Sequence, residues 1–209
     1  MCGIFGVVDK NLNKDFFKTS LMKINDLQKH RGPDDSGVFI DLNNNIGLAH
    51  RRLSIVDISK DGSQPMISSS KRYVLVFNGE IYNHRELKKI LESNNLVLKG
   101  YSDTEVFLEM IEKFGLDKTL NLAIGMFAFG LYDKVNSKLI LARDRIGEKP
   151  LYYYNNNILV FGSDIRLIKN YGKIKLSINN DAVKDLINLS YIKSHHSIYS
   201  NIHKITPGT

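Results

Sequence analysis

The chain begins MCGIFGVV (residues 1–8), and this stretch holds the only cysteine among the 209 residues. Residues 3–8 are small or apolar and lack helical spacing, which predicts a short buried strand. A lone cysteine cannot form a disulfide within the chain. Two interpretations of Cys2 stay open here: a small buried side chain at the edge of the strand, or a nucleophile. Once the initiator methionine is removed, Cys2 carries a thiol and a free α-amine, so one residue provides both a nucleophile and a base.

The composition indicates an ordinary globular protein. Hydrophobic residues make up 43% of the chain and charged residues 24%, and 209 residues suffice for one substantial core or, at the upper limit, two small domains. The formal net charge is +7, but the lysines are scattered, with no dense basic run and no RNA-binding aromatic motif, so nucleic-acid binding is not expected. No apolar run reaches the ~20 residues that span a bilayer, and no secretory signal is present. We therefore expect no membrane partner and a cytoplasmic location.

The hydrophobic pattern alternates between strand-like and helix-like segments. Strands are expected at 3–8, 38–41, 46–50, 53–57 and 73–77, and again in four segments between 126 and 163. Helices are expected at 16–29, 83–93, 102–115 and 180–190, with Asn83 and Ser102 as N-caps and Gly115 as a stop. Strands, then helices, then strands predict an α+β fold in which antiparallel sheets carry helices on their outer faces.

Two segments carry donors suited to an amide substrate. Arg51 and Arg52 lie in AHRRLSIVD (49–57), and a guanidinium fork can hold an α-carboxylate through two parallel hydrogen bonds. An exposed arginine pair is the alternative. Asn78 and Gly79 follow an apolar strand in FNGEIYNH (77–84), and a side-chain amide and a backbone N–H could converge there on an oxyanion. An Asn-Gly hairpin turn would explain the same pair.

The remaining polar segments are less specific. Asp103 in SDTEV (102–106) either caps a helix or accepts a hydrogen bond from a ligand ammonium group. RGPDDSG (31–37) is expected to form a flap or a structural turn. The six histidines, which include the adjacent His195 and His196, form no metal-ligand pattern, so no metal is expected. The motifs of phosphate-binding loops and serine hydrolases are absent.

Nine segments, taken in order along the chain, resemble the N-terminal glutamine amidotransferase domain of glutamine-hydrolysing asparagine synthetases. They are MCGIFGVV, HRGPDDSG, AHRRLSIVD, QPM, FNGEIYNHREL, SDTEV, GMFAFGLYD, ARDRIGEKPLYYY and FGSDI. The resemblance runs from Met1 to about residue 168. It implies an α+β fold in the form of a four-layer αββα N-terminal-nucleophile hydrolase sandwich with two antiparallel sheets.

The resemblance also implies a mechanism. Cys2, exposed after loss of Met1, attacks the side-chain amide of L-glutamine, with its own α-amine as proton acceptor and donor. Ammonia leaves, and the γ-glutamyl thioester is hydrolysed to glutamate. Arg51 occupies a position that is usually acidic in this family, and alignment of the motif favours Arg52 as the residue that binds the substrate α-carboxylate.

The other implied site residues follow from the same motifs. Leu53, Ser54, Ile55 and Val56 line the substrate pocket. Asn78 and Gly79 form the oxyanion hole, and Glu80 and Asp103 help to bind the amino end of the substrate. Cys2 is thus expected to be the catalytic nucleophile, and Asn78 and Gly79 are the other expected catalytic residues.

The resemblance implies a domain organisation as well. Residues 1–170 are expected to form a glutamine amidotransferase type 2 domain, and residues 171–209 to begin a linker to a synthetase domain outside this sequence. No cofactor is expected in the first domain, whereas ATP and Mg²⁺ belong to the synthetase domain, which amidates aspartate or a related carboxylate. The expected partners are L-glutamine and that C-terminal domain, and a homodimer is possible.

Three alternatives remain at the level of the sequence. The domain could serve a related synthetase-like enzyme in sugar or surface-polymer biosynthesis. It could belong to the amidotransferases of purine or hexosamine synthesis, although FNGEIYN and RIGEKPLYY favour the asparagine synthetase branch. A catalytically idle regulatory or interaction domain is the alternative from another class, and the joint presence of Cys2, Arg52, Asn78, Gly79 and Asp103 argues against it.

Overall fold

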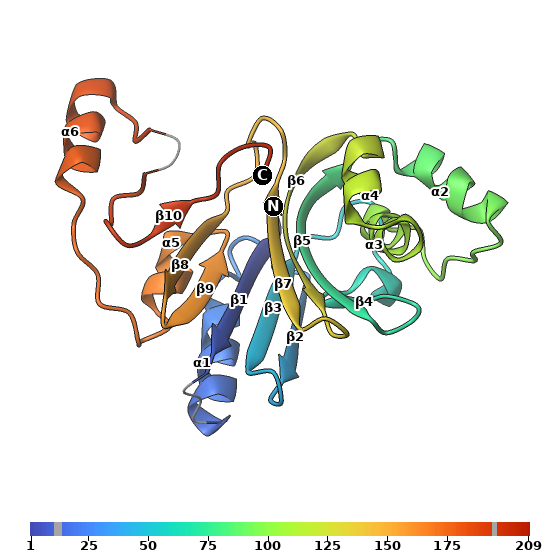
Figure 1. The fold of residues 1–209 in the computed structure, drawn as a ribbon, viewed down its shortest axis with the longest axis horizontal. Coiled ribbons are helices and arrows are strands. Elements are labelled where there is room, and N and C mark those ends of the chain that lie inside the picture. The colour runs from blue at the N-terminus through green and yellow to red at the C-terminus, as the bar shows by residue number, and fades with distance from the viewer. Residues whose placement is uncertain (11–13, 194–195) are drawn as a thin grey trace.

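Two antiparallel sheets lie face to face, with helices on their outer faces (Figure 1). This computed structural model describes residues 1–10, 14–193 and 196–209. The six-stranded sheet has the order β10-β8-β9-β1-β3-β2, and the four-stranded sheet has the order β4-β5-β6-β7. The arrangement confirms the predicted α+β sandwich.

The strands are β1 (Gly3–Asp9), β2 (Asp35–Asp41), β3 (Ile46–Arg52), β4 (Met66–Ile67), β5 (Tyr73–Ile81), β6 (Gly125–Asp133), β7 (Lys138–Arg143), β8 (Tyr152–Asn156), β9 (Ile158–Gly162) and β10 (His203–Lys204). The α-helices are α1 (Lys14–Leu27), α2 (His84–Ser93), α3 (Asp103–Phe114), α4 (Leu116–Leu122), α5 (Ile165–Lys169) and α6 (Asn180–Leu189), and a short 3-10 helix, η1, spans Lys60–Gly62.

The six-stranded sheet is covered on its outer face by α1 and α5. Phe17, Leu21 and Ile24 recur at helical spacing on α1 and are fully buried against the outward side chains of β1, such as Phe5. This spacing gives the helix one apolar stripe, and burial of that stripe accounts for most of its stability.

The four-stranded sheet is covered by α2, α3 and α4. Its core with α3 contains a group of phenylalanines whose ring centroids lie 5.5 to 6.2 Å apart. They are Phe77, Phe107, Phe127 and Phe129. Aromatic pairs at this separation add to the hydrophobic contribution of their buried area, so α3 is held firmly over the strand that carries Asn78 and Gly79.

A third core fills the space between the two sheets. Ile4, Leu48, Val76 and Phe161 are buried there. Gly130 faces the Phe161 ring, because a Cβ at this glycine would lie 2.5 Å from the ring. The glycine therefore permits the close approach of the two sheets, and the approach brings the ends of β1, β3 and β5 to one edge of the sandwich.

Three details of the predicted secondary structure are wrong. Residues 53–57 form a loop, because Asp57 is buried there to accept backbone hydrogen bonds while Ile55 is exposed. Asn78 and Gly79 lie within β5 and not in a hairpin turn. Asn83 precedes α2, but its side chain bonds the backbone at Leu122 and Ile124 instead of capping the helix.

The caps at both ends of α3 are confirmed. The Ser102 side chain accepts a hydrogen bond from the Thr104 N–H, and Gly115 ends the helix with φ of 83°. The Glu105 carboxylate accepts from the backbone N–H groups of Lys99 and Gly100, at 2.8 Å each, and so orders the preceding loop. The hydrogen bond at the Ser102 cap therefore determines where α3 begins, and this determines the position of Asp103, the first residue of the helix.

The segment after residue 170 returns to the sandwich. Lys173 forms a 2.6 Å ion pair with the buried Asp9, Ile202 is buried with the core beneath α1, and β10 pairs with β8. The domain boundary expected near residue 170 stays a prediction, but residues beyond it contribute to the same sheet. In the described parts of the chain, no helix is both long and apolar enough to cross a bilayer.

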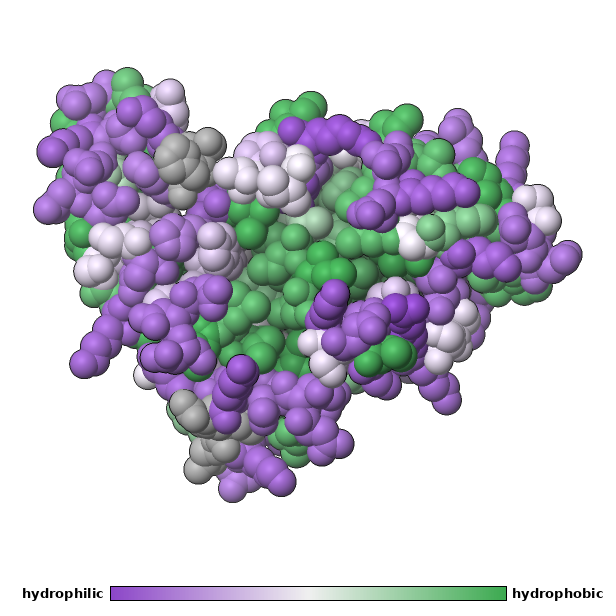
Figure 2. All heavy atoms as spheres, viewed as in Figure 1, coloured by the Kyte–Doolittle hydropathy of each residue, from purple (hydrophilic) through white to green (hydrophobic). Residues whose placement is uncertain are grey.

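The surface agrees with the scattered charge of the sequence. Figure 2 shows apolar residues gathered in the middle of one face, around the strands, with hydrophilic residues distributed along the rim over α6 and α2. The hydrophilic residues of this face are therefore spread over several elements rather than concentrated in one patch.

Asp133→Asn is expected to lower the free energy of unfolding by about 1 to 2 kcal/mol near pH 7. The Arg72 guanidinium donates to both oxygens of the Asp133 carboxylate, at 3.1 and 2.7 Å, and holds the pKa of that carboxyl well below its usual range. A lowered pKa means that this stabilisation is present above about pH 4 and is lost as the pH falls through the folded-state pKa. Urea denaturation at pH 7 and pH 3 measures the effect, which should shrink at pH 3. Asp181→Asn, which removes an exposed ion pair, is the control and should change stability by less than about 0.5 kcal/mol; equal losses for both variants would contradict the argument.

Candidate active site

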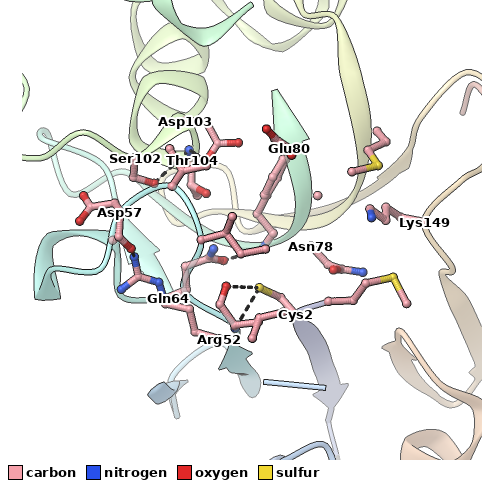
Figure 3. Close-up of a pocket in the computed structure, with 18 residues that line it drawn as sticks. Cys2, Arg52, Asp57, Gln64, Asn78, Glu80, Ser102, Asp103, Thr104 and Lys149 are labelled. Atoms are coloured by element: carbon pink, nitrogen blue, oxygen red, sulfur yellow. Dashed lines mark hydrogen bonds between the residues drawn. The ribbon is translucent and has the colours of Figure 1, made fainter. Parts of the chain in front are cut away.

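A cavity of about 220 Å³ opens where the ends of β1, β3 and β5 meet the start of α3 (Figure 3). At about 30 Å³ for each water molecule, it has room for a ligand of amino-acid size. The predicted site residues that line it are Cys2, Arg52, Leu53, Ile55, Val56, Asn78, Gly79, Glu80 and Asp103. Ser54 is the exception, since its backbone N–H donates to Asp34 outside the cavity lining.

Cys2 immediately precedes the central strand β1 and faces the cavity. Its Sγ accepts a hydrogen bond from the Leu53 N–H at 3.4 Å, and its carbonyl oxygen accepts one from Arg31 Nε at 3.1 Å. Burial raises the pKa of the Cys2 thiol, although the Leu53 hydrogen bond and the nearby positive charges act in the opposite direction. The thiol is thus mostly protonated near neutral pH, and a base must remove its proton before it can act as a nucleophile.

Arg51 and Arg52 point to opposite faces of β3, as adjacent residues of a strand must. Arg51 forms an ion pair with the exposed Asp26 on α1. Arg52 lines the cavity, is 7% exposed, and donates to the carbonyl oxygens of Asp57 and Ser59, at 2.7 Å for Ser59. These two carbonyls orient the guanidinium and leave its other N–H donors for a ligand.

The loop after β3 closes around the Arg52 guanidinium. The Asp57 carboxylate accepts from the backbone of Ser59 at 2.7 Å and of Tyr101 at 3.1 Å, which ties this loop to the segment before α3. Gly62 in η1 lies against the guanidinium, because a Cβ at this position would overlap it. The position of Arg52 therefore depends on a residue with no side chain.

The second half of β5 presents an open edge to the cavity. The short β4 pairs only with Val74 and Leu75, and the N–H groups of alternate residues along a strand point to the same edge. The Phe77 N–H donates to Gln64 Oε1 at 2.6 Å, and the Ile81 N–H donates to Asp103 Oδ2 at 2.8 Å. Between them, the Gly79 N–H has no protein partner in the part of the chain that the structure describes.

Asn78 adds a second unpaired donor beside that edge. Its side-chain nitrogen is buried and makes no hydrogen bond with any described residue. Buried polar groups are rarely left unpaired in native proteins, so the Asn78 amide and the Gly79 N–H indicate that a ligand oxygen belongs in this part of the cavity. His50 lies behind the pair, with its Nε2 3.1 Å from the Phe77 carbonyl oxygen, and burial lowers the pKa of this histidine to about 4.

Asp103 and Glu80 provide negative charge at the same cavity. The Asp103 carboxylate is 6% exposed and accepts from the Ile81 and Thr104 N–H groups, at 2.8 and 2.9 Å. Burial raises the pKa of Asp103, and the two backbone hydrogen bonds act in the opposite direction. The Asp103 carboxylate accepts a hydrogen bond at the start of α3, as the cap interpretation expects, and it also lines the cavity. The ligand interpretation stays a prediction.

Sequence reasoning missed several lining residues. Asp57, Gly62, Gln64 and Lys149 all line the cavity, and none was assigned a role. The signal for Gln64 and Lys149 was their position in two of the quoted segments, QPM and ARDRIGEKPLYYY. Asp57 ends a segment that was taken for a strand, so its buried carboxylate could not be foreseen.

Two other segments are placed outside the site. Arg31 ends the turn after α1, residues 32–34 form a short connection, and Asp35 begins β2, which favours the structural interpretation over a flap. His195 lies outside the described residues. Among the residues that the structure does describe, no group of three or more histidine, cysteine, aspartate and glutamate side chains could hold a metal ion.

Two antiparallel sheets lie between helices, with a cysteine immediately before the central strand β1 and a cavity at that cysteine, and this arrangement is the fold of N-terminal-nucleophile hydrolases. The fold is similar to that of the solved glutamine phosphoribosylpyrophosphate amidotransferase from Bacillus subtilis, with a TM-score of 0.64 and 22% identity over 82% of this chain and 44% of that one. The family described as "Glutamine amidotransferase domain" matches residues 1–209, and the chain belongs to this family.

The chain is similar in sequence to several glutamine-hydrolysing asparagine synthetases. The chain is 40% identical to a putative glutamine-hydrolysing asparagine synthetase of Methanocaldococcus jannaschii, over 98% of this chain and 42% of the relative. It is 34% identical to asparagine synthetase 1 of Bacillus subtilis, over 100% of this chain and 33% of the relative. It is 38% identical to asparagine synthetase B of Escherichia coli, over 80% of this chain and 30% of the relative. The chain is thus homologous to the amidotransferase part of these synthetases, and it spans less than half of their length.

Proposed function

We propose that this protein hydrolyses L-glutamine to L-glutamate and ammonia, with Cys2 of the mature chain as the nucleophile. The observation that supports this most strongly is the placement of Cys2 in one cavity with two unpaired donors, the Gly79 N–H and the Asn78 amide. A nucleophile together with an oxyanion site is the combination that acyl transfer requires.

The charges of the cavity fit the zwitterionic end of an amino acid. The Arg52 guanidinium binds the substrate α-carboxylate, and Asp103 with Glu80 accepts from its ammonium group. Leu53, Ile55 and Val56 contact the aliphatic part of the side chain. With its charged end held in this way, the carboxamide of glutamine reaches toward Cys2, whereas an amino acid with a shorter side chain does not.

The reaction then proceeds in two steps. The α-amine takes the Cys2 thiol proton, Sγ bonds to the carboxamide carbon, and Asn78 and Gly79 stabilise the resulting oxyanion. The amine returns the proton to the leaving nitrogen, so ammonia departs and a γ-glutamyl thioester remains. Water adds to the thioester with the amine again as base, which releases glutamate and restores the thiol.

We further propose that ammonia passes to a C-terminal, ATP- and Mg²⁺-dependent synthetase domain that amidates aspartate or a related carboxylate. The lengths and names of the curated relatives support this proposal. The amidotransferase domain itself needs no cofactor in this proposal, and a homodimer and a cytoplasmic location are part of it. An amidotransferase that serves sugar or surface-polymer synthesis remains the alternative for the acceptor.

The test uses the purified protein. An intact-mass measurement shows whether Met1 has been removed, and incubation with L-glutamine should release glutamate and ammonia in equal amounts. A chain that begins at Cys2 and still produces neither product would favour the catalytically idle domain. Aspartate, added with L-glutamine, ATP and Mg²⁺ to the full-length protein, should be converted to asparagine; failure of this second reaction alone would overturn the proposed acceptor.

Gly62→Ala is expected to raise the KM for L-glutamine about tenfold and to change kcat by less than about threefold. The new methyl group would overlap the Arg52 guanidinium, which must move away from the position set by the Asp57 and Ser59 carbonyls. Steady-state kinetics measures the effect, with Ser63→Ala at the next position as the control. An unchanged KM in the Gly62 variant would contradict the idea that this glycine places the guanidinium.

A further inference from the structure

Lys149 is a buried cation that the proposed mechanism does not use. It is 8% exposed and lines the same cavity as Cys2 and Asn78. Its amine makes no hydrogen bond or ion pair with any residue in the described ranges. Figure 3 shows Lys149 and Asn78 on one side of Cys2, with Arg52 and Asp57 on the other, and the amine end of Lys149 points into the cavity.

The loop that carries Lys149 is built to hold this position. The Asp144 carboxylate accepts hydrogen bonds from five backbone N–H groups, at 2.6 to 3.2 Å, including those of Phe127 on β6 and of Lys149 itself. Arg143 Nε donates to the Lys149 carbonyl oxygen at 2.7 Å. A loop tied at this many points keeps its backbone in place, so the Lys149 side chain extends into the cavity from a fixed position.

The other charged groups near the N-terminal residue have defined partners. Arg31 donates to the Cys2 carbonyl oxygen, and because this acceptor is neutral the positive charge of Arg31 also acts on Cys2. In the proposed complex, the Arg52 guanidinium is paired with the substrate α-carboxylate, and the carboxylates of Asp103 and Glu80 are paired with the substrate ammonium group. The Asp57 carboxylate is engaged with the backbone N–H groups of Ser59 and Tyr101. Among the described residues that line the cavity, Lys149 thus adds a positive charge without a counter-charge on the Asn78 side of Cys2, besides the charge of Arg31.

We propose that the positive charge of Lys149 keeps the α-amine of mature Cys2 unprotonated, so that this amine is available as the base near neutral pH. A nearby cation disfavours protonation of an amine, because the protonated form would add a second positive charge. Lys149 is thus a positioning residue that acts through the amine and does not contact the substrate. This assignment rests on the proposed function, since only a catalytic α-amine has to be neutral.

The expected effect is a shift in the pH profile. Without the cation, the α-amine holds its proton to higher pH, so the acidic limb of kcat/KM against pH moves upward. Two unit charges that share a partly desolvated cavity interact enough to move this limb by about one pH unit. A loss of packing alone would lower kcat/KM at all pH values and leave the position of the limb unchanged.

The experiment compares Lys149→Met, which removes the charge but keeps the length, with Lys149→Arg, which keeps the charge. The acidic limb should rise by about one unit in Lys149→Met and Lys149→Gln and stay within about 0.3 units of the wild type in Lys149→Arg. Lys138→Met, at the exposed start of the hairpin that leads into the same loop, is the control. Thermal denaturation identifies any variant that does not fold, and Lys149→Gln serves if Lys149→Met fails.

A second measurement does not depend on glutamine hydrolysis. In the Cys2→Ser background, competitive acetylation of the α-amine, followed by mass spectrometry, gives the pH at which that amine loses its proton. Adding Lys149→Met to this background should raise that pH by a similar amount. Identical acetylation profiles with and without Lys149 would overturn the assignment, and so would an unshifted acidic limb. If the Cys2→Ser proteins show the shift in amine titration but the wild-type chain hydrolyses no glutamine, the proposed function is overturned and the electrostatic effect is not.

Discussion

Cys2→Ala is expected to lower the rate of glutamine hydrolysis by at least about 1,000-fold. Alanine removes the atom that bonds to the substrate carbon, and among the described residues that line the cavity there is no second thiol and no histidine to replace it. Water would have to attack the carboxamide directly, with only the oxyanion donors to assist. The substrate contacts proposed for Arg52 and Asp103 do not involve sulfur, so the affinity for glutamine should remain within about threefold of the wild type.

Two measurements separate these effects. Steady-state release of glutamate gives the loss in rate, and calorimetric titration of the Cys2→Ala protein with L-glutamine gives the affinity. Cys2→Ser is the matched variant, because it keeps a hydroxyl and an α-amine but is a weaker nucleophile at neutral pH, and it should retain only a trace of activity. If Cys2→Ala kept more than about a tenth of the wild-type rate, the nucleophile would have to be sought elsewhere.

The fold was predictable where a regular pattern extends over several turns or strand residues. α1 and α3 have apolar stripes, and α3 also has a local cap at each end. The elements that escaped prediction are short: α4 has seven residues and α5 has five, and β4 has two. Such elements are too short to carry a period, and tertiary contacts, such as the burial of Leu167 on α5, decide their structure.

The site was predicted from the order of the nine quoted segments along the chain, and not from the hydrophobic pattern of any one segment. Strand alternation could establish that Arg51 and Arg52 face opposite sides, but not which side holds the cavity. The pairing of β3 with β1, with Arg51 opposite Gly3, is what directs one arginine inward. Gln64 shows the same limit, since its role is to accept from a backbone N–H 13 residues further along. Contacts of this kind exist only after the sheets have packed.

The orphaned donors explain why this cavity differs from an ordinary gap between loops. Phe77 and Ile81 have their N–H groups satisfied by side chains from two separate segments, Gln64 and Asp103. The N–H between them is left open, and a side chain at Gly79 would collide with β6. Among the described residues, the second half of β5 has no neighbouring strand on this side, so side chains accept from two of its N–H groups and the N–H of Gly79 stays open. An oxyanion site needs an open donor of this kind.

Arg52→Met is expected to raise the KM for L-glutamine about 100-fold and to lower kcat by less than about tenfold. Methionine keeps much of the apolar length of the side chain but removes the guanidinium that pairs with the substrate carboxylate. The loss falls mainly on binding, because this contact lies at the end of the substrate remote from the reacting carbon. Some loss in kcat follows as well, since a loosely held substrate presents its carboxamide less often in the reactive position.

Arg51→Met provides a control at the adjacent residue. It removes the same charge from the same strand, but Arg51 points away from the cavity, to Asp26 and the Asn25 carbonyl oxygen. Its KM should stay within about threefold of the wild-type value. Steady-state kinetics on both variants, together with glutamate binding as a readout free of catalysis, tests the assignment. Equal changes in KM for the two variants would show that net charge, and not the guanidinium fork of Arg52, controls binding. The two arginines are adjacent, and what distinguishes them is the face of β3 to which each side chain points.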